Sequence, residues 1–384
     1  MPGGLPVAPV YDLKLKGSDL VAATHGRSFW VLDDIEPMRQ LKAAPGKVQL
    51  VTPRDTVRAR LSWSAGSGFA KKGVSYGPAF GIGGGTETMV GSDGKPGRRF
   101  LEVGENPPNG ALIYYQLPQG FKGPVKLSFL DEAGHAVNVL ASDDASLSSG
   151  KKPGTEPGLN RVVWDLRHRG PVKLDPALMT RRNKPLAEDA EDIPGPAVVP
   201  GRYRVVLEAA GQRLEAGFAV VKDPRVKTSQ RAFEQQGALL RQLYDRWSRL
   251  NEGVNRIRLL KRQLRELQRR LGSGTQDQAL AERGKSMIVA LEAIEGVLVD
   301  IHRESSRDVL RHRAGLNDTL SDLISVVAIA DEPPTQQARE VSQEAMAKVD
   351  AELARLDALV AGEIAALDAA LRKAGIEVVG PARG

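Results

Sequence analysis

Two pairs of residues near the start of the sequence carry side chains that could do chemistry. His25 and Arg27 flank Gly26, so a base and a cation share one turn, and Asp33 and Asp34 form a carboxylate pair. Glycoside hydrolysis needs two carboxyl groups at a set separation across the scissile bond. Neighbouring residues of a strand point to opposite faces, so Asp33 and Asp34 do not converge. We therefore expect the aspartates to cap a turn after a strand, and His25 to have no catalytic role.

A second candidate is the pair Trp164 and Asp165 with Tyr203, which could stack on a sugar ring and bind its hydroxyl groups. Trp164 ends the apolar run 162–164, and Tyr203 follows a Pro-Gly turn as a corner residue does. Both positions are typical of aromatic anchors in a core. We predict that Trp164 and Tyr203 are structural.

The sequence predicts no catalytic, metal-binding or cofactor-binding set. The chain has no cysteine, which excludes disulfides and thiolate chemistry. His135 and His168 fall in predicted loops, while His302 and His312 are ten residues apart across a predicted helix break. That separation does not place two ligands on one helix face.

A basic strip on the first predicted helix could bind an anionic polymer or nucleic acid. Its central members are Arg256, Arg258, Arg262 and Arg265. Long helices in bundles commonly pair such arginines with acidic residues, and the last predicted helix supplies several, including Asp350 and Asp357. We expect a solvated face balanced by ion pairs, which disfavours nucleic acid.

Composition sets the broad class. The chain has 384 residues, 41% of them hydrophobic, and a formal net charge of +7. Two or three domains fit this length. No apolar run is long enough to span a membrane, and the first residues lack the basic and apolar regions of a secretory signal.

Alternating apolar residues predict strands in the first part of the chain. Residues 19–34 read as two strands joined by a turn in which Gly26 supplies a positive φ. We assign residues 1–44 to an incomplete sheet and 45–225 to an antiparallel β-sandwich of immunoglobulin-like type. Within the sandwich, 64–98 is expected to be a glycine-rich loop and 170–200 a long surface excursion.

From residue 226 the hydrophobic period changes to that of helices. Thr228 or Ser229 can cap the first helix, and four apolar stripes follow one another up to residue 375. We predict an antiparallel helical bundle over 226–375, followed by a tail at 376–384. The apolar positions of the first stripe are Leu240, Leu243, Trp247, Leu250, Val254, Ile257, Leu264 and Leu271.

The run Thr24-His25-Gly26-Arg27, followed by Trp30, Asp33 and Asp34, resembles the closing blade of bacterial β-propeller proteins with BNR or sortilin-type repeats. The resemblance continues through 106–111, 158–166, 200–203 and 223–225, and the sandwich is also similar to that of flagellar hook-capping proteins. It implies that residues 1–44 are the incomplete last blade of a propeller whose earlier blades are missing here, and that a sandwich and a helical tail follow. These relatives are usually exported and are often labelled glycoside hydrolases or sialidases.

The resemblance and the missing chemistry together predict a non-catalytic interaction or structural module of a BNR-repeat propeller protein. Its partners would be proteins or glycans, or a second copy bound through the N-terminal strands. An alternative is an accessory part of a glycoside hydrolase whose catalytic propeller is absent. A third hypothesis is anionic-polymer binding through the basic helix.

Overall fold

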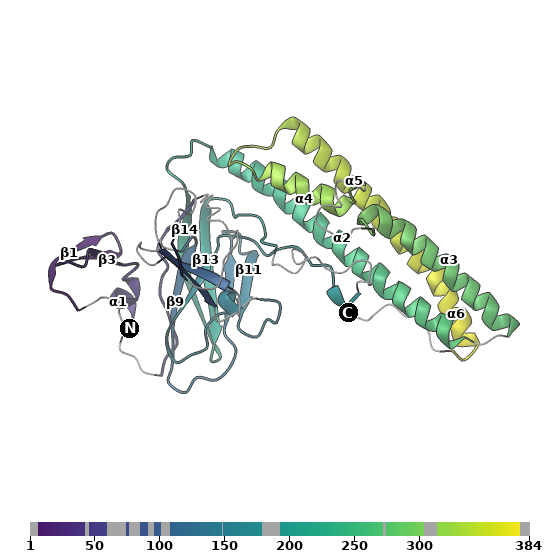
Figure 1. Ribbon diagram of the computed structural model, residues 1–384, viewed down its shortest axis with the longest axis horizontal. Coiled ribbons are helices and arrows are strands. Elements are labelled where there is room, and N and C mark those ends of the chain that lie inside the picture. The colour runs from purple at the N-terminus through teal and green to yellow at the C-terminus, as the bar shows by residue number, and fades with distance from the viewer. Residues whose placement is uncertain are drawn as a thin grey trace. The chain divides into compact units, whose positions relative to one another are not determined.

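The computed structural model divides into two compact units. Unit 1 comprises residues 1–167 and 198–227, and unit 2 comprises 168–197 and 228–384. The structure describes residues 7–42, 46–59, 74–76, 85–90, 96–100, 108–147, 149–178, 193–271, 274–302 and 313–376. Helices and strands both occur, so the expected mixed α and β architecture with more than one domain is present (Figure 1).

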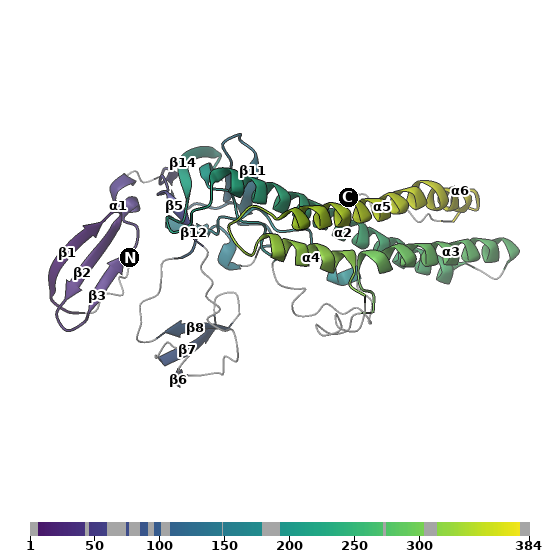
Figure 2. The same ribbon diagram turned by 90° about the horizontal axis from the view of Figure 1, so that it is seen from above.

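Unit 1 begins with a three-stranded antiparallel sheet in the order β1-β2-β3, followed by a short helix, α1. The predicted strands and turn are β2, β3 and the residues between them, where Gly26 has φ +71°. The sequence analysis missed β1, which pairs with β2 and is visible in Figure 2. The bounds are β1 Val10–Lys16, β2 Asp19–Thr24, β3 Phe29–Leu32 and α1 Glu36–Gln40.

Two further sheets of unit 1 share one hydrophobic core. One has the order β11-β10-β13-β14-β5 and the other β12-β9-β4; only the β14 and β5 pair is parallel. Trp164 lies at the centre of this core, stacked on Phe129 with ring centroids 4.4 Å apart. The bounds are β4 Gln49–Leu50, β5 Thr56–Arg58, β9 Ala111–Leu117, β10 Lys126–Leu130, β11 Ala136–Ala141, β12 Gly158–Trp164, β13 Gly201–Ala209 and β14 Gln212–Lys222.

The expectation of a loop over 64–98 is wrong in part. Three short strands form an antiparallel sheet there, β6 Val74–Tyr76, β7 Gly85–Val90 and β8 Pro96–Phe100. The run Thr86-Glu-Thr-Met-Val90 in β7 contains β-branched residues, which favour strands and were outweighed by the glycine content of the region. The cluster 81–84 lies outside the described residues.

In its described residues, unit 2 contains five α-helices around a hydrophobic core of their own. Ser229 caps the first of them, because its side chain accepts a hydrogen bond from the Ala232 N–H at 3.3 Å. A π-helical turn, Val360–Ile364, joins the last two. The bounds are α2 Gln230–Arg270, α3 Thr275–Leu298, α4 Leu316–Val327, α5 Gln336–Leu359 and α6 Ala365–Lys373.

α2 is antiparallel to α3 and to α4, as predicted. The antiparallel prediction is wrong for the consecutive helices α3 and α4, which run in the same direction, and for the neighbours α2 and α5, which run parallel. Arg258 and Arg265 of α2 pair with Glu295 and Glu292 of α3, so later residues of one helix meet earlier residues of the other. α3 and α4 have 24 and 12 residues, about 54 Å of helix together, and follow one another along the 41 residues of α2 (Figure 1). α3 and α4 thus cover successive parts of α2. α5 runs parallel to α2.

Candidate interaction site

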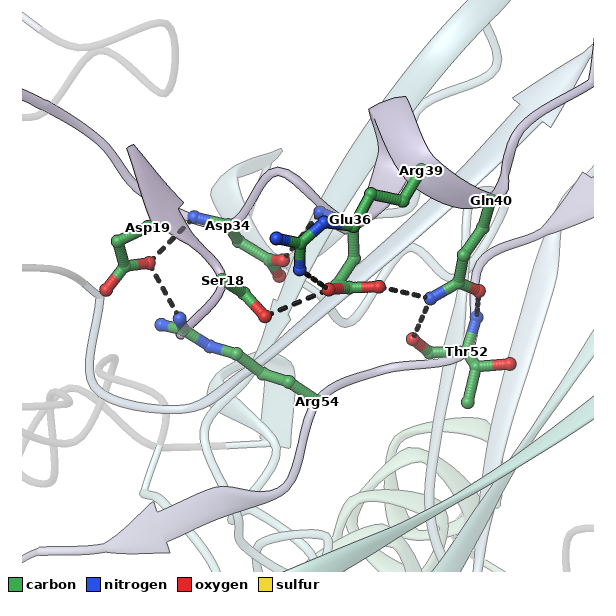
Figure 3. Close-up of polar contacts among 8 residues, drawn as sticks. All are labelled: Ser18, Asp19, Asp34, Glu36, Arg39, Gln40, Thr52 and Arg54. Carbon is green, nitrogen blue, oxygen red and sulfur yellow. Dashed lines mark hydrogen bonds and ion pairs between the residues drawn. The ribbon is translucent and has the colours of Figure 1, made fainter. Parts of the chain in front are cut away.

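A cluster of polar side chains holds the N-terminal sheet of unit 1 to the segment that precedes β5. We call this cluster the N-terminal lock (Figure 3). The Asp19 carboxylate accepts hydrogen bonds from Arg54 Nη1 at 2.9 Å and from the backbone N–H of Asp34 at 3.0 Å. Arg54 comes from residues 51–55, so this ion pair ties the first strands to the rest of the unit. The members are Ser18, Asp19, Asp34, Glu36, Arg39, Gln40, Thr52 and Arg54.

Glu36 is the most connected carboxylate of the lock. Its two oxygens accept hydrogen bonds from Gln40 Nε2 at 2.8 Å, Arg39 Nη1 at 2.7 Å and Ser18 Oγ at 2.9 Å. These donors stabilise the charged form, and they hold the pKa of Glu36 below its ordinary value in that order of importance. Glu36 is therefore an ionised anchor and no proton donor at neutral pH.

Two side-chain amides act as substitutes for strand pairing. Gln40 donates to the Thr52 carbonyl at 3.2 Å and accepts from the Thr52 N–H at 2.8 Å (Figure 3). Gln49 makes the same two-way contact with the backbone of Lys42, at 3.0 and 3.1 Å. Side-chain hydrogen bonds, and not strand pairing, thus hold the chain that follows α1 to the segment around β4.

Asp34 occupies the buried centre of the lock. Its φ is +59°, and its Oδ1 accepts the Glu36 N–H at 3.1 Å, so it caps the turn between β3 and α1, which is the role that the sequence predicts. Burial raises the pKa of Asp34. Burial, and then the charge of Asp34, raise the pKa of Tyr114, while a hydrogen bond with Arg161 opposes the rise.

A small apolar cluster accompanies the lock. Val51, Leu112 and Tyr114 are buried together, with Leu41 and Val163 packed against them. Leu112 and Tyr114 belong to β9, whose alternate residues Ala111, Ile113, Tyr115 and Leu117 face the main core. No group of three metal-binding side chains occurs in the described ranges.

The predicted turn residues lie at one end of the N-terminal sheet. Thr24 Oγ1 donates to the Ser28 carbonyl at 2.7 Å, and Trp30 Nε1 donates to the Arg27 carbonyl at 2.9 Å. The His25 ring is exposed and lies 5.2 Å from the ring of Tyr11. His25 is not brought near Asp34, which is at the opposite end of the sheet. The structure forms no acid and base pair from these residues.

Trp164 and Tyr203 lie together in the core rather than on a surface. Their ring centroids are 5.6 Å apart, and Tyr203 donates from its hydroxyl to the Val199 carbonyl at 2.7 Å. Trp164 Nε1 donates to the Arg167 carbonyl at 3.0 Å. The Asp165 carboxylate forms an ion pair with Lys151 at 4.0 Å.

The basic strip of α2 is largely neutralised within unit 2. Arg256 pairs with Asp357 at 2.8 Å, and Arg265 pairs with Glu292 at 3.1 Å. Arg258 is buried against Glu295, whereas Arg262 is exposed. The four arginines therefore do not present one basic surface.

The N-terminal sheet exposes apolar side chains on both of its faces. The register places Leu13, Ala22 and Trp30 in one row across the strands, and Leu15, Leu20 and Leu32 in the next row on the same face. We call these six residues the apolar face. Leu13 and Leu15 are 56% and 59% exposed, and Phe29 on the opposite face is 73% exposed.

Sequence reasoning missed the lock and the apolar face. The signal for β1 was present, because Val10–Lys16 alternates apolar and polar residues ahead of a Gly17 turn. The lock had no such signal, since Asp19, Arg54 and Gln40 are far apart in sequence and have no motif spacing.

Comparisons with known proteins identify no relative: no family model, no curated protein and no solved structure matches the chain. None of the helices in the described ranges is long and apolar enough to cross a membrane.

Proposed function

We propose that this chain is a non-catalytic interaction module whose apolar face docks on a β-sheet of a propeller-type protein partner. The observation that carries the proposal is the exposure of Leu13, Leu15, Trp30 and Leu32 on one side of a three-stranded sheet. Contiguous apolar patches on a folded surface mark interaction sites.

The shape of the apolar face supports a sheet as the partner. Alternate residues of all three strands point the same way and form two rows, which is the surface that packs against a second sheet at about 10 Å. β1 and β3 each pair only with β2 among the described strands, so both outer edges can accept a further strand.

The lock supports a docking role because it fixes the sheet while leaving its apolar residues free. Its contacts are polar and come from the ends of the strands and from α1. The sequence resemblance of residues 19–34 to a closing propeller blade supports a propeller as the source of the partner sheet. We further propose that the two-sheet body of unit 1 is immunoglobulin-like.

The test is fragment complementation. A BNR-type propeller truncated before its own closing blade is mixed with the full chain, and binding is measured by calorimetry and light scattering. We expect a complex with the unaltered chain and none with the Leu13→Asp and Leu15→Asp double variant. Leu159→Asp, at a position that is 40% exposed on β12, is the matched control and should bind. Absence of binding, or equal binding by the double variant, would overturn the proposal.

Light scattering of the chain alone tests self-association. A dimer that is lost in the double variant would assign the apolar face to contact with a second copy of the chain.

The glycoside hydrolase alternative has its own assay. We expect no turnover of sialosides by this chain, and activity that Asp33→Asn or Asp34→Asn abolishes would contradict a non-catalytic role. Deleting residues 1–40 should leave the body and the helices folded, because β1–β3 pair only with one another in the described structure.

A further inference from the structure

Residues 168–197, between β12 and β13, belong to unit 2, so the assignment of the excursion 170–200 to the sandwich is wrong for most of its length. The two ends of this segment meet at its base. The His168 N–H donates to the Pro196 carbonyl at 2.9 Å, which joins the outgoing and returning legs. A Cβ at Gly170 would meet the Ile193 carbonyl, and one at Gly195 would meet the carbonyls of His168 and Arg169. The two backbones therefore approach so closely that both positions require glycine.

The outgoing leg is bound along α2 by side chains that form hydrogen bonds with its main chain. Ser248 Oγ accepts the Val172 N–H at 3.2 Å, and Asn251 Nδ2 donates to the Val172 carbonyl at 2.6 Å. Asn255 Nδ2 donates to the Lys173 carbonyl at 2.9 Å, and Asn255 Oδ1 accepts the Asp175 N–H at 2.8 Å. We call Ser248, Asn251 and Asn255 the amide ladder.

The spacing of the amide ladder matches an extended chain. Asn251 and Asn255 are four residues apart, so they lie on one helix face about 6 Å apart along the axis. Two residues of extended chain cover about 6.6 Å. The ladder can therefore follow a peptide along α2 from one asparagine to the next.

Two rungs of the ladder are oriented by groups outside the bound leg. Asn317 Nδ2 of α4 donates to Asn251 Oδ1 at 2.7 Å, which turns the Asn251 amino group toward Val172. Ser248 donates its own proton to the Tyr244 carbonyl at 3.0 Å, so its oxygen faces the peptide as an acceptor. Neither contact involves the bound leg, so the two rungs are oriented independently of it.

From this geometry we propose that the amide ladder is a binding site for an extended polypeptide, which it recognises by its main chain, and that residues 171–175 occupy it in this structure. Leu174 adds an apolar contact because it packs against the helical core. The ligand class is an extended segment with an apolar residue two positions after the one that Ser248 and Asn251 contact. This inference is independent of the N-terminal sheet.

The test uses the chain with residues 171–193 replaced by two glycines, which bridges the closed base directly and removes the bound leg from the ladder. The probe is a synthetic peptide of residues 170–178 with blocked ends, and its binding is measured by calorimetry. N-methylation of Val172 and Asp175 removes the two main-chain donors without changing a side chain. We expect this peptide to bind at least tenfold more weakly, since each lost hydrogen bond weakens binding roughly threefold to tenfold.

Variants of α2 supply the reciprocal evidence. Asn255→Leu should weaken peptide binding about tenfold or more, whereas Glu252→Leu, an exposed position of the same helix, should not. Absence of peptide binding at millimolar concentration, or equal binding by the N-methylated peptide, would overturn the proposal.

A second measurement uses the unaltered loop. In Asn255→Leu the amide of Asp175 should exchange its hydrogen about tenfold faster, with the helical circular dichroism unchanged. Unchanged exchange at Asp175 would also overturn the proposal.

Discussion

Arg258 of α2 and Glu295 of α3 form an ion pair at 2.7 Å that is almost fully enclosed, with side chains 7% and 3% exposed. The second oxygen of the same carboxylate accepts a hydrogen bond from Lys261 Nζ at 2.8 Å. One buried carboxylate therefore contacts two cations, and Lys261 Nζ also lies 3.1 Å from Glu292 Oε1.

Glu295→Gln should destabilise unit 2 by about 3–5 kcal/mol, because it leaves Arg258 buried without a counter-charge and leaves Lys261 with Glu292 alone. Urea unfolding followed by helical circular dichroism measures the loss. Glu344→Gln, which breaks an exposed pair with Lys348, is the control and should change stability by less than about 1 kcal/mol. A loss below that limit for Glu295→Gln would show that water or rearrangement compensates the charges.

Trp247 tests the apolar stripe of α2. The side chain is 6% exposed in the helical core, and in the described structure its indole N–H has no hydrogen-bond partner. Trp247→Ala should cost about 3 kcal/mol or more, while Trp247→Phe should cost less than about 1.5 kcal/mol, since it keeps the ring and removes an unsatisfied donor. Equal losses for the two variants, measured by thermal unfolding, would contradict this explanation.

Asp34 predicts a pH dependence of unit 1. Its pKa is raised from 3.8, first because of burial, so the folded state favours the protonated carboxyl. The stability that comes from the protonated carboxyl of Asp34 is fully present below pH 3.8. It is lost as the pH rises through the pKa of Asp34 in the folded state. Asp34→Asn keeps an acceptor for the Glu36 N–H and tolerates a positive φ. The variant should unfold at a higher temperature at pH 7, with the difference vanishing near pH 3. A less stable variant at pH 7 would mean that Arg54 depends on the charge.

The pKa of Asp223 is shifted in the opposite direction. Hydrogen bonds from the Arg225 side chain, and then from its backbone N–H, lower the pKa of Asp223 to about 2. Its stabilising contribution is therefore present above pH 3.8 and is lost as the pH falls toward 2. In Arg225→Gln, carbonyl NMR titration should give an Asp223 pKa between 2 and 3.8, because the backbone N–H remains. An unchanged pKa would assign the shift to the backbone alone.

The sequence predicted the elements whose evidence is periodic. The stripe from Leu240 to Leu264 lies on one helix, and Ser229 caps that helix as expected. The apolar run that ends at Trp164 is a core strand. In each case the signal is local, since helix and strand periods place burial at fixed spacings.

The candidate sites depend on contacts between distant residues, which no local pattern reports. Asp19 and Arg54 are 35 residues apart, and Asn255 and Asp175 are 80 apart. Asparagine in the middle of a helix has no strong propensity signal, so the amide ladder could not be predicted from the sequence. The loop expected over β7 failed for a different reason, because glycine content was weighed above the β-branched residues between the glycines.

The end-to-end arrangement of α3 and α4 has a consequence for how α2 opens. The first half of α2 contacts α4, as in the hydrogen bond from Gln236 to the Val327 carbonyl at 2.8 Å, and the second half contacts α3. One continuous helix is therefore shared by two sets of neighbours that meet near Gly315. We expect that α4 can separate from the first half of α2 while α3 stays packed on the second half, and the reverse. The two halves of α2 would then open as separate cooperative units. Amide hydrogens before and after Asn255 should then exchange as two groups with different opening free energies.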